Sequence, residues 1–360
     1  MTALKNNLDE LQSKAKERTV KTQTIEYDLE TIVKKIDRNI IKLNPDYQRK
    51  HRWTNEASSK LIESLILNIP VPFVYISQDV DVDEETDDDV SRYSVIDGQQ
   101  RLTAIFNFFN NDYPLTDLEV LSPLNGCFYK DLPPFLIRRL EERTIRCLRI
   151  DSTIDQQVKY DIFERLNSGS VKLEPQELRN ATCRGPFKLL IKKLSKDPIF
   201  LLNANLSPSS KRVVKMEDEE LVLRYFAVTY KDGYKEYKGG FKRFLTDKMV
   251  EFNKLSKDEL REFELEFKGV MELLRKQVNE LPFAKYRYSN GKLSRMSKYN
   301  VSVFDAMICL GKKAYTSKSI IPKDATINLF KNKDFFTACE GSVNDVSKIT
   351  KRIEIAMDLI

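Results

Sequence analysis

The residues Asp97–Arg101 (Asp-Gly-Gln-Gln-Arg) place a carboxylate, a glycine, two amides and a guanidinium in one short stretch. An apolar run before them predicts a strand, and the spacing of Leu102, Ile105 and Phe109 predicts a helix after them. A glycine turn that leads into a helix offers backbone N–H groups and the positive end of the helix dipole to an anion. These residues therefore predict a phosphate-binding site.

Each residue of this turn has an expected role. The N–H groups of Gly98, Gln99, Gln100 and Arg101 would hold phosphate, and Arg101 would neutralise its charge. Asp97, through Mg²⁺, would orient an attacking water, with Gln100 positioning that water. The structural alternative is a tight turn in which Asp97 caps the helix and Arg101 forms an ion pair.

Composition limits the chemistry of the 360-residue chain. Hydrophobic residues make up 41% and charged residues 32%, as in an ordinary globular protein. The one histidine, His51, lies in no H-E-x-x-H context and no Ser-His-Asp pattern is evident, so a zinc protease and a triad hydrolase are not expected. No G-x-x-x-x-G-K-[ST] loop is present either, so a nucleotide site would not be of the P-loop kind.

Charge is unevenly distributed along the chain. The 60 basic and 54 acidic residues give a net charge of +6, and eight of the acids lie between residues 79 and 89, so the remainder carries +14. A basic body permits nucleic-acid binding. The five scattered cysteines favour reduced thiols, and the polar start and the lack of a long apolar run favour a cytoplasmic protein without a membrane partner.

Two basic segments contain aromatic residues that suit DNA. Tyr47, Gln48, Arg49 and Arg52 precede Trp53, and residues 284–300 contain five bases, three tyrosines and no acid. The second segment is as well explained by a solvated loop between helices. The DNA contacts expected from the two segments are Tyr47, Gln48, Arg49, Arg52, Lys285, Arg287, Lys292 and Arg295.

Periodicity predicts an α+β protein with two domains. Residues 1–22 form a charged helical arm, and residues 23–182 form an α/β domain in which segments 73–77 and 91–97 are a hairpin with the acidic segment 79–89 as its loop. Thr54 is expected to cap a helix, and Pro175 to lie in the first turn of another. Residues 183–360 show only helical periodicity, which predicts an all-helical second domain.

Three blocks of the α/β domain resemble the DUF262 family of GmrSD-type and SspE-type bacterial defence proteins. The first runs from Pro45 to Pro72, the second contains Asp97–Arg101 and Thr103, and the third runs from Ile162 through Arg165 and Asn167 to Ala181. The resemblance implies a ParB/sulfiredoxin-like fold for this domain. It also implies that Gly98–Arg101, Thr103, Arg165 and Asn167 contact a nucleoside triphosphate, ATP or GTP with Mg²⁺.

The resemblance further implies a role in restriction or antiviral defence, with DNA that carries modifications as a partner. Many relatives carry an HNH nuclease domain, which a chain with one histidine cannot hold. Three hypotheses follow: a nucleoside triphosphatase, a non-hydrolysing nucleotide-switched adaptor for a partner nuclease or ATPase subunit, and a ParB-like metal-dependent nuclease. The sequence alone does not separate them.

Overall fold

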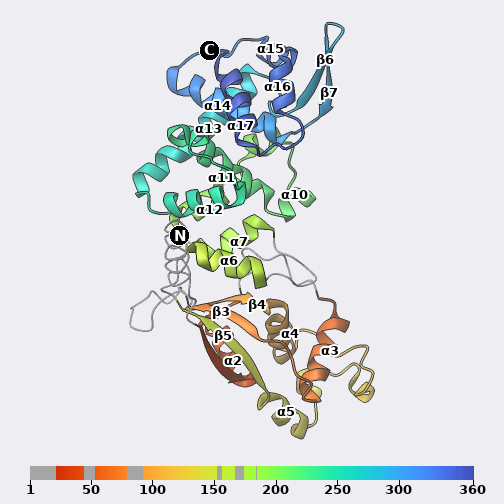
Figure 1. Ribbon diagram of the computed structural model, residues 1–360. Coiled ribbons are helices and arrows are strands. Elements are labelled where there is room, and N and C mark those ends of the chain that lie inside the picture. Colours follow the sequence, from red (N-terminus) through yellow and green to blue (C-terminus); the bar gives the residue numbers. More distant parts are fainter. Residues whose placement is uncertain (1–21, 44–52, 79–91, 152–155, 167–173, 184) are drawn as a thin grey trace, which may run out of the picture. The chain divides into compact units, whose positions relative to one another are not determined.

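The computed structural model describes residues 22–43, 53–78, 92–151, 156–166, 174–183 and 185–360. The chain divides into two compact units, residues 1–173 and 174–360 (Figure 1). The expected N-terminal arm, except for its last residue, and the acidic segment 79–89 lie outside the described residues.

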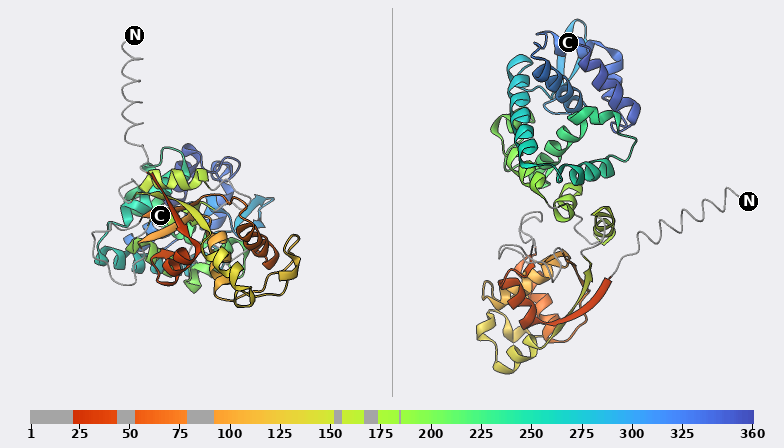
Figure 2. Two further views of the ribbon diagram at one scale, coloured as in Figure 1. Left: turned by 90° about the horizontal axis from the view of Figure 1, so that it is seen from below. Right: turned by 90° about the vertical axis from the view of Figure 1, so that its left-hand side faces the viewer.

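A five-stranded mixed sheet with the order β1-β5-β3-β4-β2 lies at the centre of the first unit. Neighbours β1–β5 and β3–β4 are antiparallel, whereas β5–β3 and β4–β2 are parallel. β3 and β4 are the two strands of the predicted hairpin, which is confirmed, and β1 forms an edge of the sheet (Figure 2, red). The strands are β1 (Thr22–Asp28), β2 (Ile41–Lys42), β3 (Val74–Gln78), β4 (Tyr93–Asp97) and β5 (Thr144–Ile150).

Helices of the first unit bury one face of this sheet. Apolar residues from four helices pack with apolar residues of the strands in one core. The helices contribute Leu29, Ile32, Leu61, Ile62, Leu102, Phe108, Leu136 and Leu140, and the strands contribute Val74, Ile76, Val95, Ile145 and Cys147. Thr54 accepts a hydrogen bond from the Ala57 N–H, so the predicted cap is confirmed. The helices are α2 (Leu29–Asp37), α3 (Asn55–Ile66), α4 (Gln99–Phe109), η1 (Ser122–Leu124), η2 (Tyr129–Asp131), α5 (Pro134–Glu141) and α6 (Gln156–Leu166).

The second unit is mainly helical and has a large aromatic core. Its helices are α7 (Pro175–Thr182), α8 (Pro186–Leu194), α9 (Pro198–Asn203), α10 (Lys211–Val214), α11 (Glu217–Thr229), η3 (Tyr230–Lys235), α12 (Phe241–Phe252), α13 (Lys257–Gln277), α14 (Val301–Ser317), α15 (Ala325–Lys331), α16 (Lys333–Ala338) and α17 (Val346–Met357). Pro175 is the first residue of α7, as predicted. The rings of Phe187, Phe226, Phe252 and Phe263 pack against one another in its core.

The expectation of an all-helical second unit is wrong at one place. β6 (Lys285–Ser289) and β7 (Lys292–Ser297) form an antiparallel hairpin. Asn290 and Gly291 form its two-residue turn, with φ of 50° and 78°. Both central residues of a type I′ turn need positive φ, and Asn-Gly is the pair that tolerates it best.

Three helices of the second unit meet at a buried carboxylate. Arg224 of α11 donates to both oxygens of Asp305 on α14, at 2.6 and 2.7 Å, and Arg352 of α17 donates to Asp305 Oδ2. Burial alone would raise the pKa of Asp305, but the two guanidinium groups hold it below its ordinary value. Asp305 is therefore ionised at neutral pH, and the three charges join α11, α14 and α17.

We expect Asp305→Asn to lower the free energy of unfolding by about 3–5 kcal/mol, because it leaves two buried arginines without a counter-charge. Urea denaturation at pH 7 measures this loss. Asp334→Asn is the matched control, since Asp334 pairs with Lys351 with two thirds of its side chain exposed, and should cost less than about 1 kcal/mol. Equal losses in the two variants would contradict the role of Asp305.

The pKa of Asp305 also fixes a direction for the pH dependence of stability. Its folded-state pKa lies below the unfolded-state value, so its contribution to stability is present above about pH 4 and is lost as the pH falls through the folded-state pKa.

All five cysteines are unpaired, as expected. Among the described helices, none has an apolar stretch sufficient to cross a membrane.

Candidate phosphate site at the β4–α4 turn

The turn between β4 and α4 is held in one conformation by Gly98. Its φ is +93°, a value that side chains rarely adopt, and no side chain caps α4 at this residue. A Cβ atom on Gly98 would lie 2.8 Å from Val74 Cγ2 and 3.1 Å from Arg101 Nη2. The backbone therefore passes close to β3 only because residue 98 has no side chain.

Arg101 links the end of β4 to the residues before β3. Its Nη2 donates to Asp97 Oδ2 at 2.8 Å, and its Nη1 donates to the backbone oxygen of Pro72. The ion pair of the structural alternative is thus present, but Asp97 does not cap α4. Burial lowers the pKa of Arg101, and the charge of Asp97 opposes that shift.

Asp97 is the accessible member of this pair. Its side chain is 45% exposed, whereas that of Arg101 is 12% exposed. In the register of the sheet Asp97 lies opposite Tyr75 of β3, so the two residues share a face. A ligand at the turn would therefore meet Asp97 first and reach only the edge of the guanidinium group.

The two glutamines of the turn have different environments. Gln99 is buried, whereas Gln100 is half-buried and its Oε1 accepts a 3.4 Å hydrogen bond from the Trp53 N–H. Thr103, one turn further along α4, is also half-buried. No local pattern indicates the contact between Gln100 and Trp53, because the two residues are 47 positions apart in the chain.

Tyr47, Gln48, Arg49 and Arg52 lie outside the described residues, but the residues on either side of them are placed. Before them, Lys42 of β2 pairs with Ser94 of β4, and after them Trp53 binds Gln100 of α4. The described residues that flank the first basic cluster, Lys42 and Trp53, thus lie beside β4 and beside the first turn of α4.

Arg165 lies on a helix next to the same strand. α6 contacts β4, Tyr160 and Phe163 of α6 are buried, and Arg165 near its end is exposed. Asn167 follows α6 and lies outside the described residues. Arg165 is therefore free to contact a charged ligand.

A magnesium ion that arrives with a nucleotide needs only one or two protein carboxylates, with water and phosphate as its other ligands. Asp97 suits that role, because within the described residues no hydrogen bond involves its Oδ1. No group of three or more His, Cys, Asp or Glu side chains able to hold a metal ion occurs in the described segments. The donor set fits a metal that is shared with a phosphate ligand.

The end of the third block has a structural role that the sequence did not indicate. Arg179 of α7 is fully buried and donates to Glu220 at 2.9 Å and to Gln176 at 2.9 Å, and Asn180 donates to Glu219 at 2.5 Å. These contacts join α7 to α11 within the second unit. Burial raises the pKa of Glu219, and its hydrogen bond from Asn180 opposes the shift.

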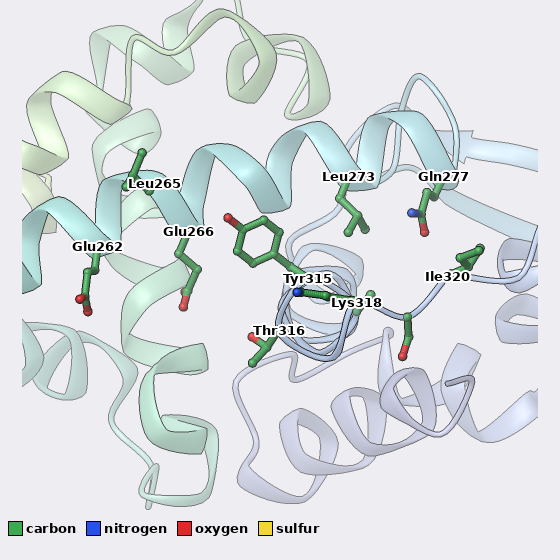
Figure 3. Close-up of a pocket in the computed structure, with 11 residues that line it drawn as sticks. Glu262, Leu265, Glu266, Leu273, Gln277, Tyr315, Thr316, Lys318 and Ile320 are labelled. Carbon is green, nitrogen blue, oxygen red and sulfur yellow. The ribbon is translucent and has the colours of Figure 1, made fainter.

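The second unit contains a different hollow, of about 690 Å³, between α13 and the end of α14 (Figure 3). Leu265, Leu273 and Ile320 line it together with Glu262 and Glu266. The ring of Tyr315 lies against α13, where a Cβ on Gly269 would come within 2.3 Å of it. An apolar hollow with two glutamates at its side does not suit phosphate.

Four predicted DNA contacts belong to the β6–β7 hairpin of the second unit. Arg287, Lys292 and Arg295 are exposed, but Lys285 is 8% exposed. The Lys285 Nζ donates to the Cys339 backbone oxygen at 3.2 Å and to Glu340 at 3.3 Å. Lys285 therefore fastens the hairpin to its own unit.

In a comparison with protein families, residues 29–183 match the model described as the N-terminal domain of the GmrSD restriction endonuclease. The matched range contains the β4–α4 turn, α6 and α7. No curated protein and no solved structure gave a match.

We expect Gly98→Ala to lower the free energy of unfolding by about 2–4 kcal/mol, because it combines positive φ with a clash against Val74. Gly126→Ala is the matched control. Gly126 has φ +89° but no atom within 4 Å of an added Cβ, so it should cost only about 1 kcal/mol. Denaturant unfolding of both variants measures the difference, and equal costs would show that the approach to Val74 is not tight.

Proposed function

We propose that this chain, whose residues 29–183 match the model of the GmrSD N-terminal domain, is a member of the GmrSD-type DUF262 family and a nucleotide-binding module of a restriction or defence system. We further propose that it hydrolyses a nucleoside triphosphate, ATP or GTP, at the Asp97–Arg101 turn. A ParB/sulfiredoxin-like fold of the first unit and association with DNA are parts of the same proposal.

One observation carries the assignment of the site. The matched range contains a turn where a glycine with positive φ starts a helix without a side-chain cap, and where an exposed carboxylate lies beside a buried guanidinium. The first turn of a helix directs N–H groups and a partial positive charge towards an anion. Asp97 and Arg101 add the groups that phosphoryl transfer needs, one to orient a nucleophile and one to neutralise charge.

The mechanism follows from how these side chains are held. Because Arg101 is fixed by Pro72 and Asp97, its charge lies under the turn before any ligand arrives, so little reorganisation is needed. Asp97 keeps one oxygen for a water molecule. Gln100, held by Trp53, is placed in the first turn of α4, and Arg165 supplies a further cation from α6. Bound Mg²⁺ would neutralise phosphate charge and would be held by Asp97 and the nucleotide itself.

A second candidate is the non-hydrolysing adaptor, and one observation favours it. Both terminal nitrogens of Arg101 already have partners, so a phosphate that recruits Arg101 must compete with Asp97 or Pro72. Such a competition would couple nucleotide binding to the position of the β4–α4 turn. The nucleotide would then act as a switch, and a partner protein would carry out the nuclease chemistry.

We expect purified protein to release phosphate from a nucleoside triphosphate in the presence of Mg²⁺. Asp97→Ala should lower the rate by a factor of about 100 or more while nucleotide affinity changes little, because Asp97 acts on the water. Arg101→Ala should abolish binding. Phosphate release and titration calorimetry with ATP, GTP, CTP and UTP measure the two effects.

Arg139→Ala is the matched control for Arg101→Ala, since Arg139 is exposed on α5 of the same unit. It should leave binding and turnover unchanged. Unchanged nucleotide affinity in Arg101→Ala would contradict the phosphate site. Binding without turnover in the wild-type protein would select the adaptor.

A further inference from the structure

The β6–β7 hairpin extends beyond the helices of the second unit as a two-stranded ribbon (Figure 1). One of its sides is fixed to that unit. The Tyr286 ring packs edge-on against Phe330 of α15 at 5.5 Å, and Tyr288 and Leu293, which face each other across the ribbon, pack on the core. With the two bonds of Lys285, these contacts fix this face of the ribbon from Lys285 to the pair of Tyr288 and Leu293 near the turn.

The ribbon and the residue that follows it carry four cations that form no ion pair with the described residues of the protein. Arg287, Lys292, Arg295 and Lys298 are exposed, and within the described part of the chain no ion pair involves them. The sequence has no acid between Glu280 and Asp305. Elsewhere in this unit exposed lysines pair with carboxylates, for example Lys193 with Glu264 and Lys351 with Asp334.

Small hydroxyl side chains lie between these cations. Arg287 faces Ser294 across the ribbon, and Lys292 faces Ser289. Serine adds hydrogen-bond donors for phosphate oxygens without adding bulk or negative charge. On the face that carries Arg287 and Lys292, cations thus alternate with hydroxyl groups, a set of side chains that suits a nucleic-acid backbone. Arg295 lies opposite Tyr286 on the other face and is exposed.

We propose that the β6–β7 ribbon binds the major groove of duplex DNA, with Arg287, Lys292, Arg295 and Lys298 on the phosphates. Two strands about 5 Å apart, with their side chains, fit a groove about 12 Å wide. The deep, narrow major groove of duplex RNA does not admit such a ribbon. This inference rests on the proposed DNA association and assigns it to a defined element, without Lys285.

The test is fluorescence anisotropy of a labelled DNA duplex of about 20 base pairs, two helical turns, titrated with the whole chain without nucleotide. The triple variant Arg287→Gln, Lys292→Gln, Arg295→Gln should bind at least about tenfold more weakly. Its slope of log affinity against log salt should fall by about 3, because three phosphate contacts are lost.

A second triple variant, Lys254→Gln, Lys257→Gln, Arg261→Gln, removes the same charge from exposed residues just before α13 and in its first turns. It should bind DNA within about twofold of the wild-type protein. Thermal unfolding of both variants checks that the second unit still folds.

Equal weakening by the two triple variants would overturn the ribbon assignment but leave DNA association standing. Equal affinity for duplex DNA and duplex RNA would overturn binding in the major groove. A wild-type chain that binds no DNA would overturn both the ribbon and the DNA association. Phosphate release is measured separately, so the nucleotide site would be unaffected by that result.

Discussion

The contact of Arg101 with Asp97 and Pro72 is the constraint on which the candidate site depends. It joins the start of α4 to the end of β4 and to the residues before β3, so three segments meet at one guanidinium group. The absence of a side chain on Gly98 leaves space for this contact, since a Cβ there would lie 3.1 Å from Arg101 Nη2. Because Arg101 is mostly buried, its charge is poorly screened by water, and the carboxylate of Asp97 is its counter-charge in the absence of a ligand.

The second unit is organised by buried charges of a different kind. Arg224, Asp305 and Arg352 join three helices, and Arg179 joins α7 to α11. Removing one partner from such a group leaves a buried charge, so these contacts favour one arrangement of the helices. The cations of the β6–β7 ribbon differ from these buried arginines, because they are exposed and form no ion pairs among the described residues. They are therefore available to bind a partner molecule, whereas the buried arginines are not.

Local signals in the sequence predicted the elements better than their pairing. The Thr54 cap and the β3–β4 hairpin depend on residues close in sequence, and both are confirmed. The parallel pairing of β3 with β5 joins strands about 70 residues apart, which periodicity does not encode. The predicted all-helical unit does not include the hairpin of residues 285–297, although Asn290-Gly291 after the alternating Tyr286 and Tyr288 is a strong turn signal.

At the candidate site, residue types predicted the ion pair of Arg101 as an alternative, but not the hydrogen bond that links Gln100 to Trp53. Trp53 is the only tryptophan of the chain. Its fluorescence during a titration with ATP or GTP and Mg²⁺ therefore tests the central claim directly. The account predicts a saturable change in the wild-type protein that is absent in Arg101→Ala; an equal change in both proteins would contradict nucleotide binding at this turn.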